Sequence, residues 1–190
     1  IDNIVTGGGS GFMADYVFTS DFDGDNDQDI FATSSNTNIN GVGCYVNNGS
    51  ANFTYTNVAG SSASAAIGAA DLDGDNDLEV IAANENGDLF VVHHDGSLML
   101  HHTYQGFTLS GISLADLDNN GQIDLLFMSS ENDQYNYSMV HIFDPSNQSE
   151  LLGWPISINA ISKGEIIVSD IDNDGEPAVS YTHLRAHDTS

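Results

Sequence analysis

Carboxylates recur at alternate positions in four short segments of the chain. The segments read DFDGDNDQD from residue 21, DLDGDNDLE from residue 71, DLDNNGQID from residue 116 and DIDNDGEPA from residue 170. Calcium is a hard cation that takes roughly six to eight oxygen ligands in a flexible geometry. A loop that wraps such an ion directs oxygen atoms inward at alternate positions, so this spacing predicts calcium-binding loops.

The segments share one predicted ligand set: the side chains of the first, third, fifth and ninth positions and the backbone carbonyl of the seventh. The fourth segment lacks the ninth carboxylate, because Ala178 stands there. The predicted metal ligands are Asp21, Asp23, Asp25, Asp27 and Asp29; Asp71, Asp73, Asp75, Asp77 and Glu79; Asp116, Asp118, Asn120, Gln122 and Asp124; and Asp170, Asp172, Asp174 and Glu176.

The sixth position of each segment predicts a tight turn. It holds Asn26, Asn76, Gly121 and Gly175, and these residue types tolerate a positive φ. Acidic hairpin turns without a metal are the alternative, but they do not explain aspartates in register with a turn residue four times. An EF-hand needs a bidentate glutamate at its twelfth position and flanking helices. The twelfth positions are Ala32, Ala82, Phe127 and Tyr181, which excludes that motif.

Strands must position these loops, because the intervening stretches are short, apolar and bounded by turn residues. Strands are predicted before the loops (16–20, 66–70, 111–115, 165–169), after them (30–34, 80–84, 125–130), and then at 41–48, 88–94 and 138–144 and at 53–58, 98–104 and 150–158. The strands that flank each loop are apolar on both faces, which is typical of strands between stacked sheets. The loops start 50, 45 and 54 residues apart, a spacing that suits four-stranded propeller blades.

The loops, the strand pattern and the spacing resemble the FG-GAP and VCBS repeats of integrin-α-like β-propellers and of bacterial secreted or surface proteins. The stretch DLDGDNDLEVIAANENGDLFVVHHDGS carries the resemblance most clearly, and ELLGWPI resembles an outer-strand region of the bacterial repeats. The chain lacks the Phe-Gly and Gly-Ala-Pro signatures that name the first family. The resemblance implies that each loop joins the first two strands of a blade, in propellers that often have about seven blades.

The predicted fold class is therefore all-β: a β-propeller fragment of about three and a half four-stranded blades. The predicted units are a linker or the end of a preceding blade (1–12), three blades (13–62, 63–108 and 109–160) and the start of a further blade (161–177). Residues 178–190 read AVSYTHLRAHDTS and resemble the translation of a transposase sequencing adapter. We expect a non-native tail there; a divergent natural strand is the alternative.

Composition limits the partners. The chain has 2 Lys and Arg against 28 Asp and Glu, a net charge of −26 and a pI near 4.1. Nucleic acid and anionic membranes are poor partners for such a chain, and no apolar run has the length of a membrane span. Divalent cations are the partners that this composition favours. Cys44 is the single cysteine and is predicted to be a buried strand residue.

Other candidate sites are weaker. A predicted turn is surrounded by four histidines: His93, His94, His101 and His102. A transition-metal site is conceivable there, but surface or cross-blade packing is favoured. The predicted pairing places His93 opposite Leu98 and His101 opposite Phe90. Trp154 is predicted to pack between blades rather than to stack on a sugar. No arrangement of serine, histidine and acid stands out, and no catalytic residue is predicted.

These patterns predict a non-catalytic, calcium-binding module of a secreted or cell-surface protein that binds an extracellular protein or polysaccharide. Export is expected because the cytosol is too poor in calcium to fill such loops. Two alternatives remain. One is part of a calcium-dependent polysaccharide lyase, for which Lys163 is the available cation; the other is a structural spacer.

Overall fold

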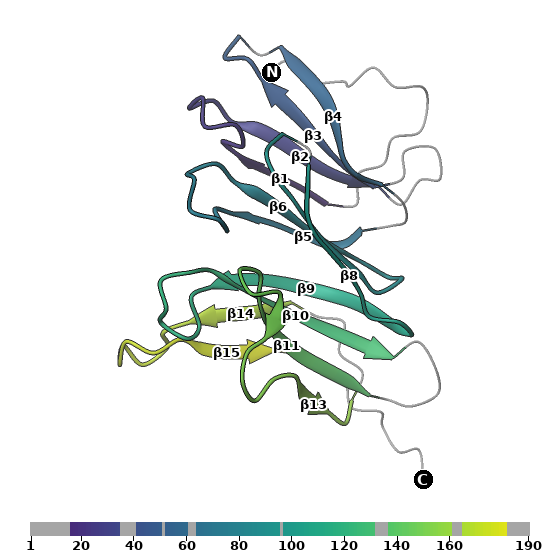
Figure 1. The fold of residues 1–190 in the computed structure, drawn as a ribbon, viewed down its shortest axis with the longest axis vertical. Helices are drawn as coiled ribbons and strands as arrows, with labels where there is room; N and C mark the ends of the chain where they lie inside the picture. The colour runs from purple at the N-terminus through teal and green to yellow at the C-terminus, as the bar shows by residue number, and fades with distance from the viewer. Residues whose placement is uncertain are drawn as a thin grey trace.

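The computed structural model describes residues 16–34, 41–50, 52–60, 64–95, 97–131, 137–160 and 165–181. Within these ranges every regular element is a β-strand, and the strands form antiparallel sheets that follow one another in chain order (Figure 1). The predicted all-β class is therefore confirmed. The predicted segment 1–12 and Lys163 lie outside the described residues.

Each of the first two sheets contains four strands in sequence order, which is the meander of a propeller blade. The first sheet contains β1 (Tyr16–Ser20), β2 (Asp29–Ser34), β3 (Gly41–Asn47) and β4 (Phe53–Gly60). The second sheet contains β5 (Ser64–Ala70), β6 (Glu79–Asn84), β7 (Asp88–Val92) and β8 (Leu98–Thr103).

The third and fourth sheets continue the same order. The third contains β9 (Phe107–Ala115), β10 (Asp124–Glu131), β11 (Ser138–Asp144), β12 (Ser149–Glu150) and β13 (Ile156–Ile158). The fourth is a hairpin of β14 (Ile166–Ser169) and β15 (Ala178–Tyr181). Residues 178–181 of the predicted non-native tail thus pair with the chain, and their origin stays a prediction.

Two predicted details of the strands are wrong. The strand predicted at 150–158 is split into β12 and β13, which both pair with β11. Between them Gly153 has a φ of 94°, and Pro155 has no N–H to donate to a ladder. In the second sheet Phe90 faces His101 as predicted, but a bulge beside β8 places Leu98 opposite Val92 and not opposite His93.

Apolar side chains fill the spaces between consecutive sheets. Along β6, Val80 and Ala82 pack toward the first sheet against Phe22, Phe31 and Cys44. The alternate residues of β6 pack the other way, into a core shared with the third sheet. Successive side chains of a strand point to opposite faces, so a strand that is buried on both faces is apolar at most of its positions.

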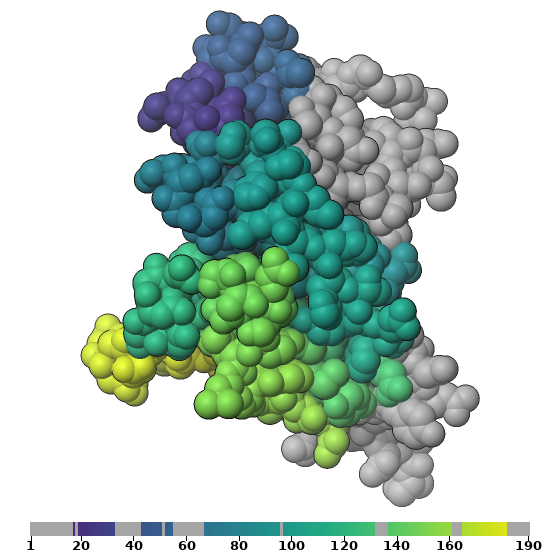
Figure 2. Space-filling model, viewed as in Figure 1, coloured from purple at the N-terminus to yellow at the C-terminus, as the bar shows by residue number. Residues whose placement is uncertain are grey.

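The third sheet repeats this arrangement. Leu125 and Phe127 of β10 belong to the core shared with the second sheet, whereas Leu126 and Met128 pack toward the fourth sheet, where Ile166 lies. Figure 2 shows the sheets packed in chain order, from purple to yellow. Trp154 packs against the core between the third and fourth sheets, and Cys44 is fully buried, so both packing predictions are confirmed. Among the described residues there is no helix of the length and apolarity that crossing a bilayer requires.

Phe127→Ala tests the double-sided packing. Phe127 is fully buried between the second and third sheets, so its truncation should lower the free energy of unfolding by about 3–5 kcal/mol. Urea denaturation followed by circular dichroism measures the change. Val17 is well exposed on β1, and Val17→Ala is the control, with an expected change within about 0.5 kcal/mol. Equal effects of the two substitutions would contradict the packing described here.

Candidate metal-binding loops

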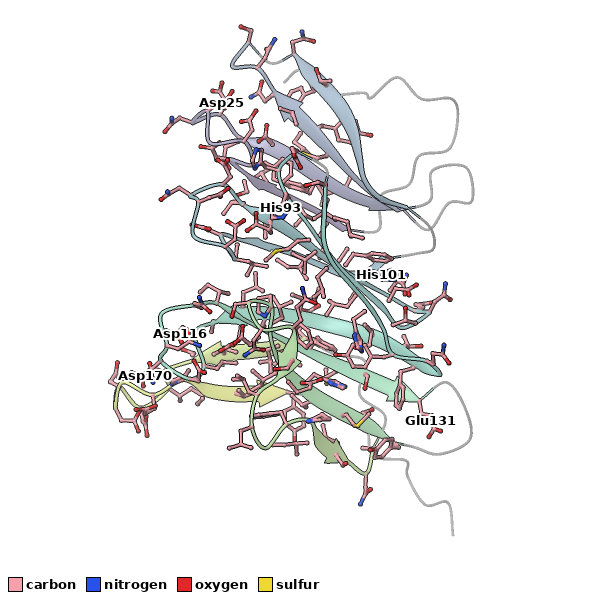
Figure 3. All side chains as sticks on the ribbon, viewed as in Figure 1. Asp25, His93, His101, Asp116, Glu131 and Asp170 are labelled. Carbon is pink, nitrogen blue, oxygen red and sulfur yellow. The ribbon has the colours of Figure 1, made fainter. Side chains whose placement is uncertain are left out.

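Each acidic segment forms the connection between the first and second strands of its sheet. The four connections join β1 to β2, β5 to β6, β9 to β10 and β14 to β15. They lie along one edge of the stack, as the labelled Asp25, Asp116 and Asp170 indicate (Figure 3). The sheet order therefore gathers the predicted ligands of separate repeats on one rim of the molecule.

The backbone of every loop turns twice through the left-handed region. The sixth positions have positive φ, as predicted: 72° at Asn26, 77° at Asn76, 87° at Gly121 and 89° at Gly175. The fourth positions also have positive φ: 72° at Gly24, 82° at Gly74, 57° at Asn119 and 58° at Asn173. This second turn was not predicted, although only Gly and Asn occupy the fourth position.

Carboxylates hold these turns through backbone hydrogen bonds. The first-position aspartate accepts the N–H of the sixth residue in all four loops: Asp21 from Asn26 at 2.9 Å, Asp71 from Asn76 at 3.2 Å, Asp116 from Gly121 at 2.8 Å and Asp170 from Gly175 at 3.0 Å. The fifth side chain accepts the N–H of the seventh residue in each loop: Asp25 from Asp27, Asp75 from Asp77, Asn120 from Gln122 and Asp174 from Glu176. The same side chains that could hold a cation thus also shape the loop.

The structure brings predicted ligands together within each of the first three loops. In the first two loops the side chains at positions one, three and five each offer an oxygen within 4.8 Å of the others: Asp21, Asp23 and Asp25, and Asp71, Asp73 and Asp75. In the third loop the group consists of Asp116, Asp118 and Asp124. The fourth loop keeps the hydrogen bonds of Asp170 and Asp174 but lacks the ninth carboxylate.

The ninth carboxylate has a role that the sequence analysis did not predict. Asp29, Glu79 and Asp124 are all fully buried. Each accepts the backbone N–H of the second loop residue: Asp29 from Phe22 at 2.7 Å, Glu79 from Leu72 at 2.7 Å and Asp124 from Leu117 at 2.9 Å. This carboxylate therefore fixes the start of the loop to the start of the second strand.

The seventh side chains of two loops point to the preceding loop. A Cβ placed on Gly24 would lie 2.8 Å from Asp77 Oδ1, so the second loop packs closely against the first. Likewise Asn119 of the third loop donates a hydrogen bond to Glu176 of the fourth, at 3.3 Å. At the seventh position only the backbone carbonyl is the predicted ligand, so these contacts leave that prediction untested.

Two buried carboxylate oxygens indicate that the loops suit a cation. Asp21 Oδ1 and Asp124 Oδ1 are buried and have no hydrogen-bond partner, which is costly for a charged group. Burial raises the pKa of Asp124, and the neighbouring Asp118 raises it further, while the Leu117 N–H partly offsets these effects. Burial and then the negative charge of Asp25 raise the pKa of Asp23. A divalent cation would supply the missing partner and cancel the repulsion, so the donor set fits a hard metal ion.

Two histidines lie beside the second loop. His93 Nδ1 lies 3.2 Å from Glu79 Oε1 and 3.6 Å from Asp73 Oδ2, and His94 Nδ1 lies 3.2 Å from Asp77 Oδ2. The favoured packing role holds for the other two histidines, since His101 stacks on Phe90 and His102 contacts Phe143 of the next sheet. In the register of β6 and β7, Val80 lies opposite Val92. Glu79 precedes Val80 and His93 follows Val92, so this register places His93 beside Glu79.

The structure also brings together a serine, a histidine and an acid. Ser129 Oγ lies 2.7 Å from His141 Nε2, and His141 Nδ1 lies 2.7 Å from Glu150 Oε1. The imidazole lies against the rings of Phe127 and Tyr104. Ser129 and His141 are 0% and 1% exposed, so a substrate cannot reach the hydroxyl in this conformation. The group is a polar network within the core.

The fold and the loops define a β-propeller-like repeat protein. The model of the FG-GAP-like repeat family matches residues 21–82 and 71–127, and each match starts at the first aspartate of a loop. The chain belongs to the FG-GAP-like repeat family. Members of this family are generally non-catalytic repeat modules. No curated protein matches the chain.

Gly121→Ala tests the backbone of the loops. Gly121 has a φ of 87°, and a Cβ there would meet no atom within 4 Å, so any cost of Ala comes from backbone strain. We expect the free energy of unfolding to fall by about 1–2 kcal/mol. Gly121→Asn is the matched control, because asparagine occupies this position in the first two loops. Urea denaturation should show the smaller loss for Asn, and equal losses would contradict the turn described here.

The pH dependence of stability without divalent cations tests the crowding of the carboxylates. The raised folded-state pKa values of Asp23 and Asp124, above the usual 3.8, contribute stability that is fully present below 3.8. This contribution is lost as the pH rises through the raised values. Urea midpoints of the metal-free chain should therefore rise as the pH falls from 7 toward 4.

The same titration in millimolar calcium is the control. Calcium needs deprotonated ligands, so acidification should lower the urea midpoint there. A metal-free chain whose midpoint falls steadily with acidification from pH 7 would contradict the repulsion among the loop carboxylates.

Proposed function

We propose that this chain is a non-catalytic calcium-binding repeat module of a secreted or cell-surface protein, in which the calcium ions are structural. The observation that carries the proposal is the convergence of carboxylates within the first three loops, with buried oxygens of Asp21 and Asp124 that lack a partner. Calcium is the hard cation that an all-oxygen donor set of this kind suits best. Magnesium demands a smaller, near-octahedral site and gives up its water reluctantly.

The ligands proposed for each ion are the loop oxygens at positions one, three, five and nine and the carbonyl of position seven. A bound calcium ion would supply positive charge to carboxylates that otherwise repel one another, and it would hold the first two strands of the blade together. A net charge of −26 opposes a compact fold through self-repulsion, so each bound ion also reduces the repulsion across the whole chain.

The proposed location follows from the availability of calcium. Extracellular modules bind calcium with dissociation constants of about 0.1–1 mM. At about 10 mM calcium, mass action then adds about 1–3 kcal/mol of stability per site. Several loops together would supply a sizeable share of the stability of an ordinary domain. The cytosol does not offer calcium at such concentrations, which supports a secreted or surface location.

A binding role for an extracellular protein or polysaccharide is proposed on the basis of surface chemistry. Leu152, in the turn between β12 and β13, and Ile156, at the start of β13, are exposed apolar side chains, and the half-buried Trp154 lies between them in the sequence. Exposed apolar groups that lie close together often mark interaction sites, whereas a spacer has no need of them. Calcium in this proposal stiffens the blades that present such surfaces.

Thermal unfolding tests the proposal directly. The melting temperature of the whole chain should rise with calcium between about 0.1 and 10 mM, and magnesium at equal concentrations should change it much less. Asp116→Asn replaces one first-position carboxylate by a neutral amide and should weaken the response to calcium. Asp95→Asn, at an exposed turn outside the loops, is the matched control and should leave the response unchanged. A melting temperature indifferent to calcium would contradict the proposal.

A further inference from the structure

The second loop differs from the other described loops because imidazole nitrogens face it. His93 follows β7, and its Nδ1 lies 3.2 Å from Glu79 Oε1 and 3.6 Å from Asp73 Oδ2. One oxygen of each carboxylate and this nitrogen all lie within 4.8 Å of one another. Glu79 is fully buried, whereas His93 and Asp73 are partly exposed, so solvent and ions can reach the group from one side.

The residues that stand opposite the ninth carboxylate in the neighbouring sheets explain why, among the described loops, only the second has an imidazole at this carboxylate. In the first sheet Ile30 pairs with Tyr45, so the next position places Val46 opposite Asp29. In the third sheet Leu125 pairs with Phe143, so the next position places Asp144 opposite Asp124. In the first sheet both oxygens of Asp29 are satisfied by backbone N–H groups, those of Phe22 and Asn47. In the second sheet Glu79 takes one backbone N–H and leaves its other oxygen to an imidazole.

We propose that the second loop binds a zinc-class transition-metal ion through His93 Nδ1, Glu79 Oε1 and Asp73 Oδ2. Imidazole is a favoured ligand of zinc, copper and nickel, whereas calcium takes oxygen ligands. Metal–ligand bonds of about 2.0–2.1 Å in a tetrahedron place neighbouring ligand atoms about 3.3–3.4 Å apart. The distances of 3.2 and 3.6 Å from the nitrogen to the two oxygens match the edges of that tetrahedron, and a water molecule completes it.

The surroundings of the site orient its ligands. The Leu72 N–H donates to Glu79 Oε2 at 2.7 Å and so holds Oε1 toward His93. The N–H of His93 itself donates to the Ser97 carbonyl at 2.9 Å, which fixes the turn that carries the ring. Such outer contacts set the orientation of metal ligands and tune their affinity. Two carboxylates and a neutral imidazole also balance the charge of a divalent ion.

A second imidazole borders the same loop. His94 Nδ1 lies 3.2 Å from Asp77 Oδ2 but without the geometry of a hydrogen bond, and this nitrogen is buried and has no hydrogen-bond partner. Asp75 completes a group of possible ligands with these two residues. This nitrogen is a second polar atom at the second loop that a cation could contact.

The proposed zinc site shares Asp73 and Glu79 with the proposed calcium loop, so the two ions exclude each other there. The groups of possible ligands at the first and third loops contain carboxylates, those of Asp21, Asp23 and Asp25 and of Asp116, Asp118 and Asp124, and these loops should keep calcium in the presence of zinc. The zinc site does not require the calcium proposal to be correct, because its nitrogen ligand lies outside the acidic segment.

Zinc titration of the whole metal-free chain tests the inference, in competition with a chromophoric chelator. His93→Asn should weaken the tightest zinc site by at least about tenfold, since the loss of an outer contact alone costs about 10–100-fold in affinity. His101→Asn is the matched control, because His101 lies on β8 away from the loops (Figure 3). It should leave the affinity unchanged. Long-range ¹H–¹⁵N spectra of the unmutated chain should show the His93 ring nitrogen shift on addition of zinc.

Two results would overturn the inference: a His93 ring that does not respond to zinc, or a folded His93→Asn variant that binds zinc as the unmutated chain does. If the variant does not fold, the spectra of the unmutated chain decide. A zinc response at the ring of His94 alone would place the ion on the neighbouring group and refute the ligand set proposed here. Calcium titration of the same samples tests the calcium loops separately, because a chain that binds zinc without calcium would refute only the proposed function.

Discussion

Repulsion among carboxylates confined to short loops is the constraint on which the rest of the structure depends. Each of the first three loops brings carboxylates close together and buries the ninth carboxylate against the backbone of the second loop residue. The left-handed turns at the fourth and sixth positions allow a chain of nine residues to do this. Burial and neighbouring negative charges raise the pKa of Asp23 and of Asp124, so a bound cation would stabilise the loops that contain them.

Packing between the sheets places the loops on a common rim. The second strands of the second and third sheets, β6 and β10, are buried on both faces, and their side chains alternate between the cores on either side. The loop leads directly into this strand, so each of these loops is joined to side chains of two cores. Contacts between successive loops, such as that of Asn119 with Glu176, add a second connection between blades. Ions bound on this rim would therefore stabilise more than one sheet.

Much of this organisation was predictable from the sequence, and particular residues show where prediction stops. Alternating aspartates with Asn26 or Gly121 at the sixth position define the turn locally, and the apolar runs on either side define buried strands. The split of the last strand at Gly153 and the bulge beside Leu98 depend on local backbone geometry that the apolar pattern does not encode. The contact of His93 with Glu79 required the register of two strands.

The buried network of Ser129, His141 and Glu150 was out of reach for the same reason. These residues come from three strands, and no spacing in the sequence relates them. The ninth carboxylate was recognised as a possible ligand, but its hydrogen bond to the backbone was not, since it depends on how the loop closes. Residues that act within one loop were thus predictable, and residues that act across strands were not.

Counting the calcium ions bound per chain by equilibrium dialysis is the most direct test of the central claim, that the acidic loops are closed by divalent cations. The account predicts one ion for each loop that has the ninth carboxylate, and the loss of one ion in the Asp71→Ala variant. A chain that binds no calcium at millimolar concentrations, or a variant that binds as many ions as the unmutated chain, would contradict it.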